Sequence, residues 1–311
     1  MPSIEICLIA NVGQRDLHLH GKPLDKVALR AEAERVLREM VELGKHLSMP
    51  MLDPAMEFIV SANGGTKINR VILVGTNQED ERFRPGDTIP CAEIMRRLIL
   101  SSRQDFVAKG ATVVPIRSAP HLYDRMMTLY RAEVFGHSYV HGDKVYLLCT
   151  GGTPACNTAL MVAGIERFRE RCQVLHVSEG NGGVVPLSVG SIILGTYRRE
   201  AHKRLLDSYQ FDAVASDSEE QNEAVKLIAE AAARRLNFDF EGSYMALSQV
   251  RGRHADLPSE VDKVFDESVC LKSADRDRVM RELYWNGRVK WETSAFADFL
   301  GRLWRLIEES L

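Results

Sequence analysis

VYLLCTGGTPACNT, residues 145–158, is the stretch from which the fold is best inferred. An apolar run of strand length, Val145–Cys149, breaks into Thr150-Gly151-Gly152-Thr153, and a helical pattern opens behind Pro154. Adjacent glycines let the backbone approach a ligand, and a helix N-terminus presents unpaired N–H groups. The unit therefore suits a phosphate or the polar edge of a nucleotide, bound without a strong positive charge. A glycine pair after a strand is also a common tight turn.

Strand and helix patterns alternate on both sides of this stretch. Strands are expected at 4–10, 70–74, 111–116 and 173–177, with weaker candidates at 58–62, 184–187 and 192–196. Helical periodicity is expected over 25–46, from Thr88 to about Arg103, and over 119–136. Such alternation predicts an α/β fold, in which a mostly parallel sheet carries helices on both faces.

Three polar turns follow the predicted strands. They are Asn11–Asp16, Gly75–Gln78 and Thr150–Thr153, each rich in Gly, Asn, Thr or Gln. In open parallel sheets ligands bind beyond the carboxyl ends of the strands. We therefore expect these three turns to meet at one edge of the sheet and to form a binding site there.

The pattern of the sequence changes near residue 196, where strand patterns end. Helices are expected at 197–209, 216–236 and 274–311. We expect a first domain at 1–195 and a helical region at 196–311. The last segment places Phe296, Leu300 and Trp304 on one helical face, which favours packing within a small helical domain.

Composition excludes several classes of protein. The formal net charge of −3 gives no overall attraction to duplex nucleic acid or to anionic membranes. No apolar run approaches the roughly 18–20 residues needed to span a bilayer, and the first residues lack the basic start of a signal peptide. The six cysteines form no C-x-x-C pair, and no Cys/His group has metal-ligand spacing. We expect a cytoplasmic protein with reduced cysteines, no membrane association and no metal.

Catalytic motifs are scarce. The sequence contains no G-x-S-x-G and no G-x-x-x-x-G-K-[ST], and no G-x-G-x-x-G follows the first strand. Arg15 and His20 have the spacing of some metal-independent ribonucleases, but chance explains this better because they follow a strand in the nucleotide-site region. No effector catalytic motif is found, and the sequence leaves open whether the chain is an enzyme.

The combination of motifs resembles the CARF domains of type III CRISPR ancillary proteins of the Csm6/Csx1 kind. The matching stretches are NVGQRD (11–16), VILVGTNQ (71–78) with Asp87-Thr88-Ile89, and LLCTGGTPACNTAL (147–160). The resemblance covers about residues 1–195. More loosely, 196–215 and 296–311 are similar to the helical region that joins CARF to its effector in Csm6-like proteins.

This resemblance implies a Rossmann-like sensor domain that forms a two-fold homodimer. The dimer cleft is expected to bind cyclic oligoadenylate, either tetra- or hexaadenylate, as an activating ligand and without another cofactor. Binding is expected to signal allosterically to an effector domain or partner. Because no effector was found, we expect the chain to be the sensor part of a longer protein or to act through a partner protein.

The expected ligand-binding residues come from the three turns and the segments behind them. Backbone N–H groups of the glycine turn and the helix dipole can hold a phosphate, and the Asn and Gln amides suit adenine edges and ribose hydroxyls. Asp87 either accepts from a ribose hydroxyl or an adenine amine, or caps a helix. The full set is Asn11, Gly13, Gln14, Thr76, Asn77, Gln78, Asp87, Thr88, Thr150, Gly151, Gly152, Thr153, Pro154 and Asn157.

Two other functions stay open. Some CARF domains slowly cleave their own ring, so the chain could be a ring nuclease that lines up a ribose 2′-oxygen on the adjacent phosphorus. An unrelated Rossmann-like enzyme that uses a mononucleotide or NAD is the other alternative, and the missing glycine fingerprint disfavours it.

Overall fold

The computed structural model describes residues 4–137, 140–178, 183–220, 222–254 and 258–310. The chain divides into two compact units, Met1–Leu194 and Gly195–Leu311. The division falls within helix α7 (Val189–Asp207).

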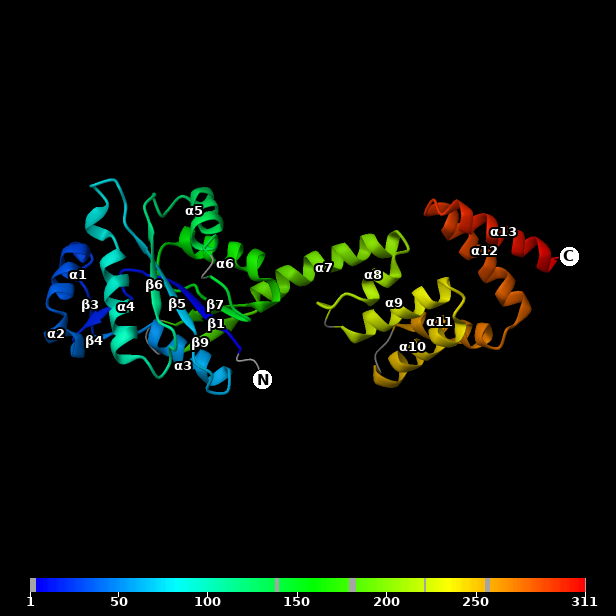
Figure 1. Cartoon of the computed structure of the whole chain (residues 1–311), viewed down its shortest axis with the longest axis horizontal. Coiled ribbons are helices and arrows are strands. Elements are labelled where there is room, and N and C mark those ends of the chain that lie inside the picture. Colours follow the sequence, from blue (N-terminus) through cyan, green and yellow to red (C-terminus); the bar gives the residue numbers. More distant parts are fainter. Residues whose placement is uncertain (1–3, 138–139, 179–182, 221, 255–257, 311) are drawn as a thin grey trace. The chain divides into compact units, whose positions relative to one another are not determined.

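The first unit is built on a six-stranded sheet with the order β6-β5-β1-β7-β8-β9 (Figure 1). Its strands are β1 (Ile6–Asn11), β5 (Arg70–Thr76), β6 (Ala111–Ile116), β7 (Lys144–Leu148), β8 (Cys172–Val177) and β9 (Val184–Leu187). All neighbouring pairs are parallel except β8 and β9. The predicted α/β fold class is therefore confirmed.

Helices cover both faces of this sheet. Side chains alternate along β1, so Ile6 and Leu8 face one layer while Cys7 and Ile9 face the other. The first layer contains α1 (Leu29–Arg38), α3 (Leu52–Ala62) and α4 (Ile89–Ser102). The second contains α5 (Tyr123–Leu129), the π-helical turn Tyr130–Val134 and α6 (Pro154–Phe168). Burial on both faces explains why the central strands read as continuous apolar runs.

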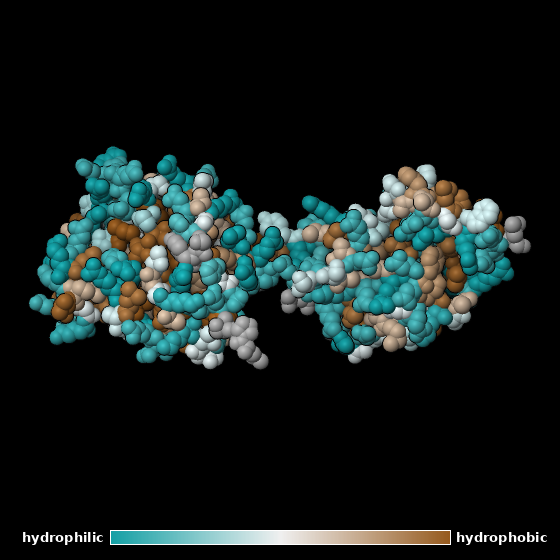
Figure 2. Space-filling view, viewed as in Figure 1, coloured by the Kyte–Doolittle hydropathy of each residue, from teal (hydrophilic) through white to brown (hydrophobic). Residues whose placement is uncertain are grey.

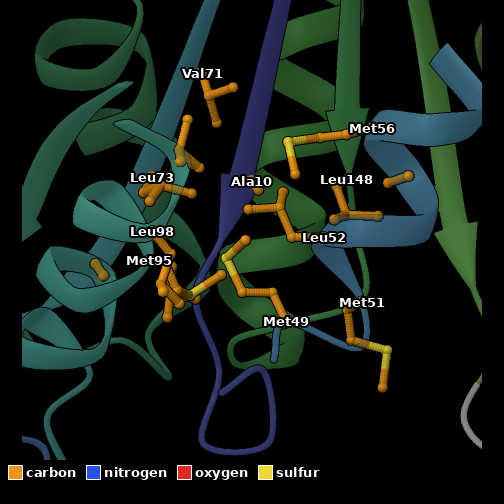
Figure 3. Close-up of a cluster of buried hydrophobic side chains, with 14 of the residues drawn as sticks. Ala10, Met49, Met51, Leu52, Met56, Val71, Leu73, Met95, Leu98 and Leu148 are labelled. Carbon is orange, nitrogen blue, oxygen red and sulfur yellow. The ribbon is translucent and has the colours of Figure 1, made fainter. Parts of the chain in front are cut away.

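The core under α3 and α4 is rich in methionine. Figure 3 shows Met49, Met56 and Met95 among Leu52, Leu73, Leu98 and Leu148. Unbranched methionine side chains adapt to irregular gaps between a twisted sheet and its helices.

A small antiparallel sheet follows the β1 turn. It consists of β2 (His18–Leu19), β3 (Lys22–Pro23) and β4 (Leu47–Ser48), in the order β3-β2-β4. Between β3 and β4 lie α1 and α2 (Met40–Leu43), and the turn Gly44–His46 leads directly into β4.

Helices are the only regular elements among the described residues of the second unit. After α7 it contains α8 (Phe211–Ala215), α9 (Glu223–Leu236), α10 (Phe240–Arg253), α11 (Ser259–Lys272), α12 (Arg276–Glu292) and α13 (Phe296–Ser310). This confirms the predicted helical C-terminal region. Gln221, inside the predicted helix 216–236, and Leu311, at the end of 274–311, lie outside the described residues.

Several expected elements differ in the structure. The predicted helix 119–136 begins only at Tyr123 and is π-helical from Tyr130. The predicted helix 216–236 begins at Glu223, and the predicted helix 274–311 is two helices, α12 and α13. The candidate strand 58–62 is the end of α3, because Leu52, Ala55, Met56 and Ile59 are buried at helical spacing. The candidate strand 192–196 lies in α7, where Ile193 and Leu194 pack against the second helix layer.

The predicted helix 25–46 is shorter and broken. It begins at Leu29 and is interrupted at Glu39 before a short α2. Val27 and Val41, apolar residues within the predicted range, are 83% and 99% exposed. They therefore do not belong to the face that packs on the sheet.

Within the described residues, no helix combines the length and the apolar character that crossing a bilayer requires.

Candidate functional site

The carboxyl ends of β1, β5 and β7 border a cleft of about 680 Å³. All three predicted turns line it, as does the β5–α4 loop. The chain runs from β1 to β5 and β6 on one side, then returns to β7 and β8 on the other side of β1. The cleft therefore lies at the point where the strand order reverses, which is where open α/β sheets bind ligands.

The glycine turn packs directly against the β1 turn. A Cβ added at Gly13 would lie 2.6 Å from the backbone nitrogen of Gly152, and one added at Gly151 would overlap Asp16 Oδ2. Gly152 also has a φ of 82°, in the left-handed region that L side chains rarely adopt. Only glycine permits this approach of two backbones, so the turn is shaped by its neighbour as well as by its own sequence.

Asp16 is a buried member of the site that the sequence analysis did not assign. Its Oδ2 accepts a hydrogen bond from Gly13 N at 2.7 Å, and the residue is 5% exposed. The Asp16 carboxylate therefore holds the β1 turn in place through the backbone of Gly13. An aspartate three residues after a strand-end glycine is a local signal for such a side chain to backbone bond.

Asp87 organises the β5 turn. Its Oδ2 accepts from Gln78 N at 2.8 Å and from an Arg30 guanidinium nitrogen at 3.4 Å, and its Oδ1 accepts from Gln78 Nε2 at 3.1 Å. The side chain is fully buried, and no side-chain cap bond forms at the start of α4. The helix-cap alternative for Asp87 is therefore wrong. Asn77 belongs to the same arrangement, since its Oδ1 accepts from Arg30 at 3.1 Å.

Two threonines lock the base of this turn to α4. Thr76 N donates to Thr88 Oγ1 at 3.0 Å, and Thr88 N donates to Thr76 Oγ1 at 2.9 Å. Each hydroxyl thus accepts from the other residue's backbone. Both residues line the cleft while they hold its wall.

A chain of side-chain hydrogen bonds runs from the β1 end into the second helix layer. Asn11 Nδ2 donates to Asn157 Oδ1 at 2.8 Å, and the hydroxyl of Tyr130 donates to Asn11 Oδ1. Burial raises the pKa of Tyr130 well above its ordinary value, so the phenol stays a neutral donor. Asn11 therefore serves mainly to connect β1 with α6 and with the π-helical turn.

The threonine hydroxyls of the glycine turn already form hydrogen bonds within the protein. Thr150 Oγ1 accepts from Val177 N at 2.8 Å, and Thr153 caps α6 by accepting from Cys156 N at 3.2 Å while its hydroxyl donates to Pro120 O. What the turn offers to a ligand is the backbone of Gly151 and Gly152 and the N-terminus of α6.

Burial makes the thiols near the cleft unreactive. It raises the pKa of Cys156, which lines the cleft, and raises that of Cys149 to about 12. Both thiols are protonated at neutral pH and are poor nucleophiles. Within the described part of the chain, no group of three or more His, Cys, Asp or Glu side chains could hold a metal ion.

The cleft brings together most of the expected site residues. The residues that line it are Asn11, Gly13, Gln14, Thr76, Gln78, Thr88, Thr150, Gly151, Gly152, Thr153 and Pro154. Asn77, Asp87 and Asn157 do not line it and instead hold residues that do.

Sequence reasoning missed the charged and aromatic part of the lining. Arg15, Lys26 and Arg82 line the cleft, as do His121 and Phe83. The expected site without strong positive charge is therefore incomplete. These residues lie in loops, where no periodic pattern marks which side chains turn toward a neighbouring strand end.

No family model and no curated protein matches this chain. Among solved structures, the chain is similar to Enterococcus italicus Csm6 bound to cyclic hexa-2′-fluoro-hexa-dAMP. The likeness covers 99% of this chain and 68% of that chain, with a TM-score of 0.54 and 12% sequence identity. The resemblance to Csm6-like proteins that the motifs predicted is therefore confirmed at the level of the fold.

Proposed function

We propose that this protein is a cyclic oligoadenylate sensor of type III CRISPR antiviral defence. Two copies hold one ring across a two-fold axis, and binding passes an allosteric signal to an effector domain or a partner protein. The observation that carries this proposal is the cleft at the ends of β1, β5 and β7, which combines glycine backbone, amides and cations in a fold shared with a Csm6.

The groups in the cleft match the parts of such a ring. Lys26, Arg15 and the α6 N-terminus suit phosphates, while the exposed Gln14 and the half-buried Gln78 carry amides that donate to and accept from adenine edges. A cyclic oligoadenylate with an even number of nucleotides has two-fold symmetry. Two identical clefts related by a two-fold axis therefore offer each half of the ring the same contacts.

Isothermal titration calorimetry with cyclic tetra- and hexaadenylate tests the proposal. We expect one ring per two chains, with the linear oligoadenylate of equal length binding more weakly because it loses more conformational freedom. Sedimentation should show a dimer. Failure of both rings to bind, or one ring per monomer, contradicts the proposal.

Lys26 provides a matched electrostatic test. Lys26→Gln should weaken ring binding about tenfold and flatten its salt dependence, because one phosphate contact is lost. Lys45→Gln is the control, since Lys45 lies in the Gly44–His46 turn and does not line the cleft. Equal effects of both substitutions would mean that only overall charge matters.

The same samples distinguish the alternative functions. Chromatography of the incubated ring shows whether linear products form, as a ring nuclease requires. Thermal-shift measurement with NAD and ATP tests the second alternative, a mononucleotide- or NAD-binding enzyme, because stabilisation by NAD alone contradicts the sensor proposal.

A further inference from the structure

Phe83 is an exposed aromatic side chain at the edge of the cleft. It lies on the loop between β5 and α4, is 49% exposed and lines the cleft. Single exposed hydrophobic residues are common on protein surfaces. Phe83 differs because it stands in a cleft whose other exposed side chains, apart from Pro154, are polar or charged.

The loop holds Phe83 through its own hydrogen bonds. Phe83 N donates to Asp80 O at 3.1 Å, and Gly86 N donates to Phe83 O at 3.2 Å. The 3₁₀ turn Arg84–Gly86 follows, and Arg84 Nε donates to Gln78 O at 3.3 Å. Because these bonds order the loop, the Phe83 side chain lies at the cleft before any ligand binds. This lowers the entropy cost of binding.

The loop lies beside the β1 turn. A Cβ added at Gly86 would lie 3.3 Å from Gln14 Nε2, so the loop that carries the aromatic ring touches an amide from the opposite wall. Arg82 is next to Phe83, with its guanidinium carbon 5.5 Å from the ring centroid, and Lys26 lines the same cleft. An aromatic face, an amide and cations thus share one cleft.

This set of groups matches one nucleotide. Aromatic side chains stack on the π-face of a base, amides bond its edge and cations take the phosphate. An aliphatic or purely anionic ligand would not need the flat ring. We propose that Phe83 is a stacking platform for one adenine in each half of the ring, an inference that rests on the proposed function.

Four variants at two positions test this role by calorimetry with the cyclic oligoadenylate that the wild type binds. Phe83→Ala should weaken binding about tenfold to a hundredfold, because one base loses its stacking partner. Phe83→Leu should weaken it nearly as much, since leucine keeps apolar bulk but has no π-face. Phe83→Trp should bind at least as well as the wild type. Tyr123→Ala is the control, because Tyr123 is 53% exposed in the same unit but does not line the cleft.

Two further readouts separate stacking from other roles. The salt dependence of binding should be the same in Phe83→Ala and the wild type, because no phosphate contact is lost. In Phe83→Trp, bound cyclic oligoadenylate should quench the fluorescence of the introduced tryptophan. This change is measurable because the native Trp285, Trp291 and Trp304 all lie beyond residue 195. The wild-type signal provides the subtraction.

The outcomes for the inference and for the function differ. If the wild type binds no ring, the proposed function fails. If the wild type binds and Phe83→Ala binds equally well, only the stacking inference fails. A Phe83→Ala protein that sediments as a monomer, while Phe83→Leu stays dimeric and binds normally, would place Phe83 in subunit packing and overturn the inference.

Discussion

The two units of this chain use their apolar side chains differently. In the first unit Leu8, Ile9, Val74 and Leu147 are buried between helix layers, and polar groups gather at the strand ends. Among the described residues of the second unit the buried cluster is small, formed by Ala231, Ala246 and Leu247 with Phe265 against it.

Large apolar side chains of the second unit lie at its surface. Figure 2 shows hydrophobic residues exposed where α12 and α13 lie. The exposed large apolar and aromatic side chains of these two helices are Tyr284, Trp285, Trp291, Phe296, Leu300, Leu303, Trp304 and Ile307. The same kind of group is therefore expected to contribute differently to the free energy of unfolding in the two units. A glycine, a carboxylate or a phenol of the first unit is fixed by close neighbours, whereas its counterpart in the second unit is exposed to water.

The largest difference in stability between the two units is expected for alanine substitutions at Gly151 and Gly301. Gly151→Ala should destabilise the first unit by about 3 kcal/mol and abolish ring binding, because the new Cβ overlaps Asp16 and lies 2.6 Å from Asn11 O. Gly301→Ala, in α13 with open space around it, should be neutral or stabilising by up to about 1 kcal/mol. Urea unfolding measures both changes, with hydrogen exchange followed in β1 and β7 peptides for Gly151→Ala and in α13 peptides for Gly301→Ala. Equal effects would show that the two turns do not pack as described.

Buried and exposed carboxylates give the next comparison. Asp87→Asn should cost about 2 kcal/mol, because a fully buried acceptor loses its charge beside Arg30 and turns an amide toward Gln78 donors. Asp298→Asn removes an ion pair with Lys290 in which the Asp298 side chain is 57% exposed, and it should change stability by less than about 0.5 kcal/mol. The measurement is the midpoint of urea unfolding for each variant, compared at an unchanged m-value. A small effect at Asp87 would mean that the β5 turn is held in another way.

Two phenols test the link between the cleft and the second helix layer. Tyr130→Phe should cost about 1 kcal/mol, because Asn11 Oδ1 loses its buried donor. It should also weaken ring binding severalfold. Tyr209→Phe removes an exposed bond to Glu292 Oε2 of 2.8 Å and should leave stability unchanged within about 0.5 kcal/mol. Binding that is unaffected in Tyr130→Phe would limit the role of Tyr130 to packing.

The smallest effect is expected on the apolar surface. Trp304 is 65% exposed on α13, so Trp304→Ser should change stability by less than about 0.5 kcal/mol. Leu247→Ala, in the buried cluster of the same unit, should cost about 2–4 kcal/mol. A loss above about 1 kcal/mol in Trp304→Ser, or a change in sedimentation, would show that this surface is covered in solution.

Local sequence signals predicted the scaffold well. Apolar runs bounded by glycine and polar turns predicted the main strands of the sheet. The periodicity beyond residue 196 predicted the helical character of the second unit, but not that α9 begins at Glu223 or that α12 and α13 are separate helices. The signals were wrong where a short apolar run fitted two periods, as at 58–62 and 192–196, because five residues do not distinguish a strand from a buried helix end.

The sequence by itself determined that three glycine-, amide- and threonine-rich turns follow parallel strands, because strand and turn chemistry is local. Tertiary structure decided that β1 lies between β5 and β7, which makes these turns one cleft. It also decided that Tyr130 and Asp87 hold residues that line the cleft, while Arg15, Asp16, Lys26 and Phe83 line it themselves. Apart from the local bond between Asp16 and Gly13, these side chains meet residues that are distant in sequence, and no residue pattern along the chain records such a contact.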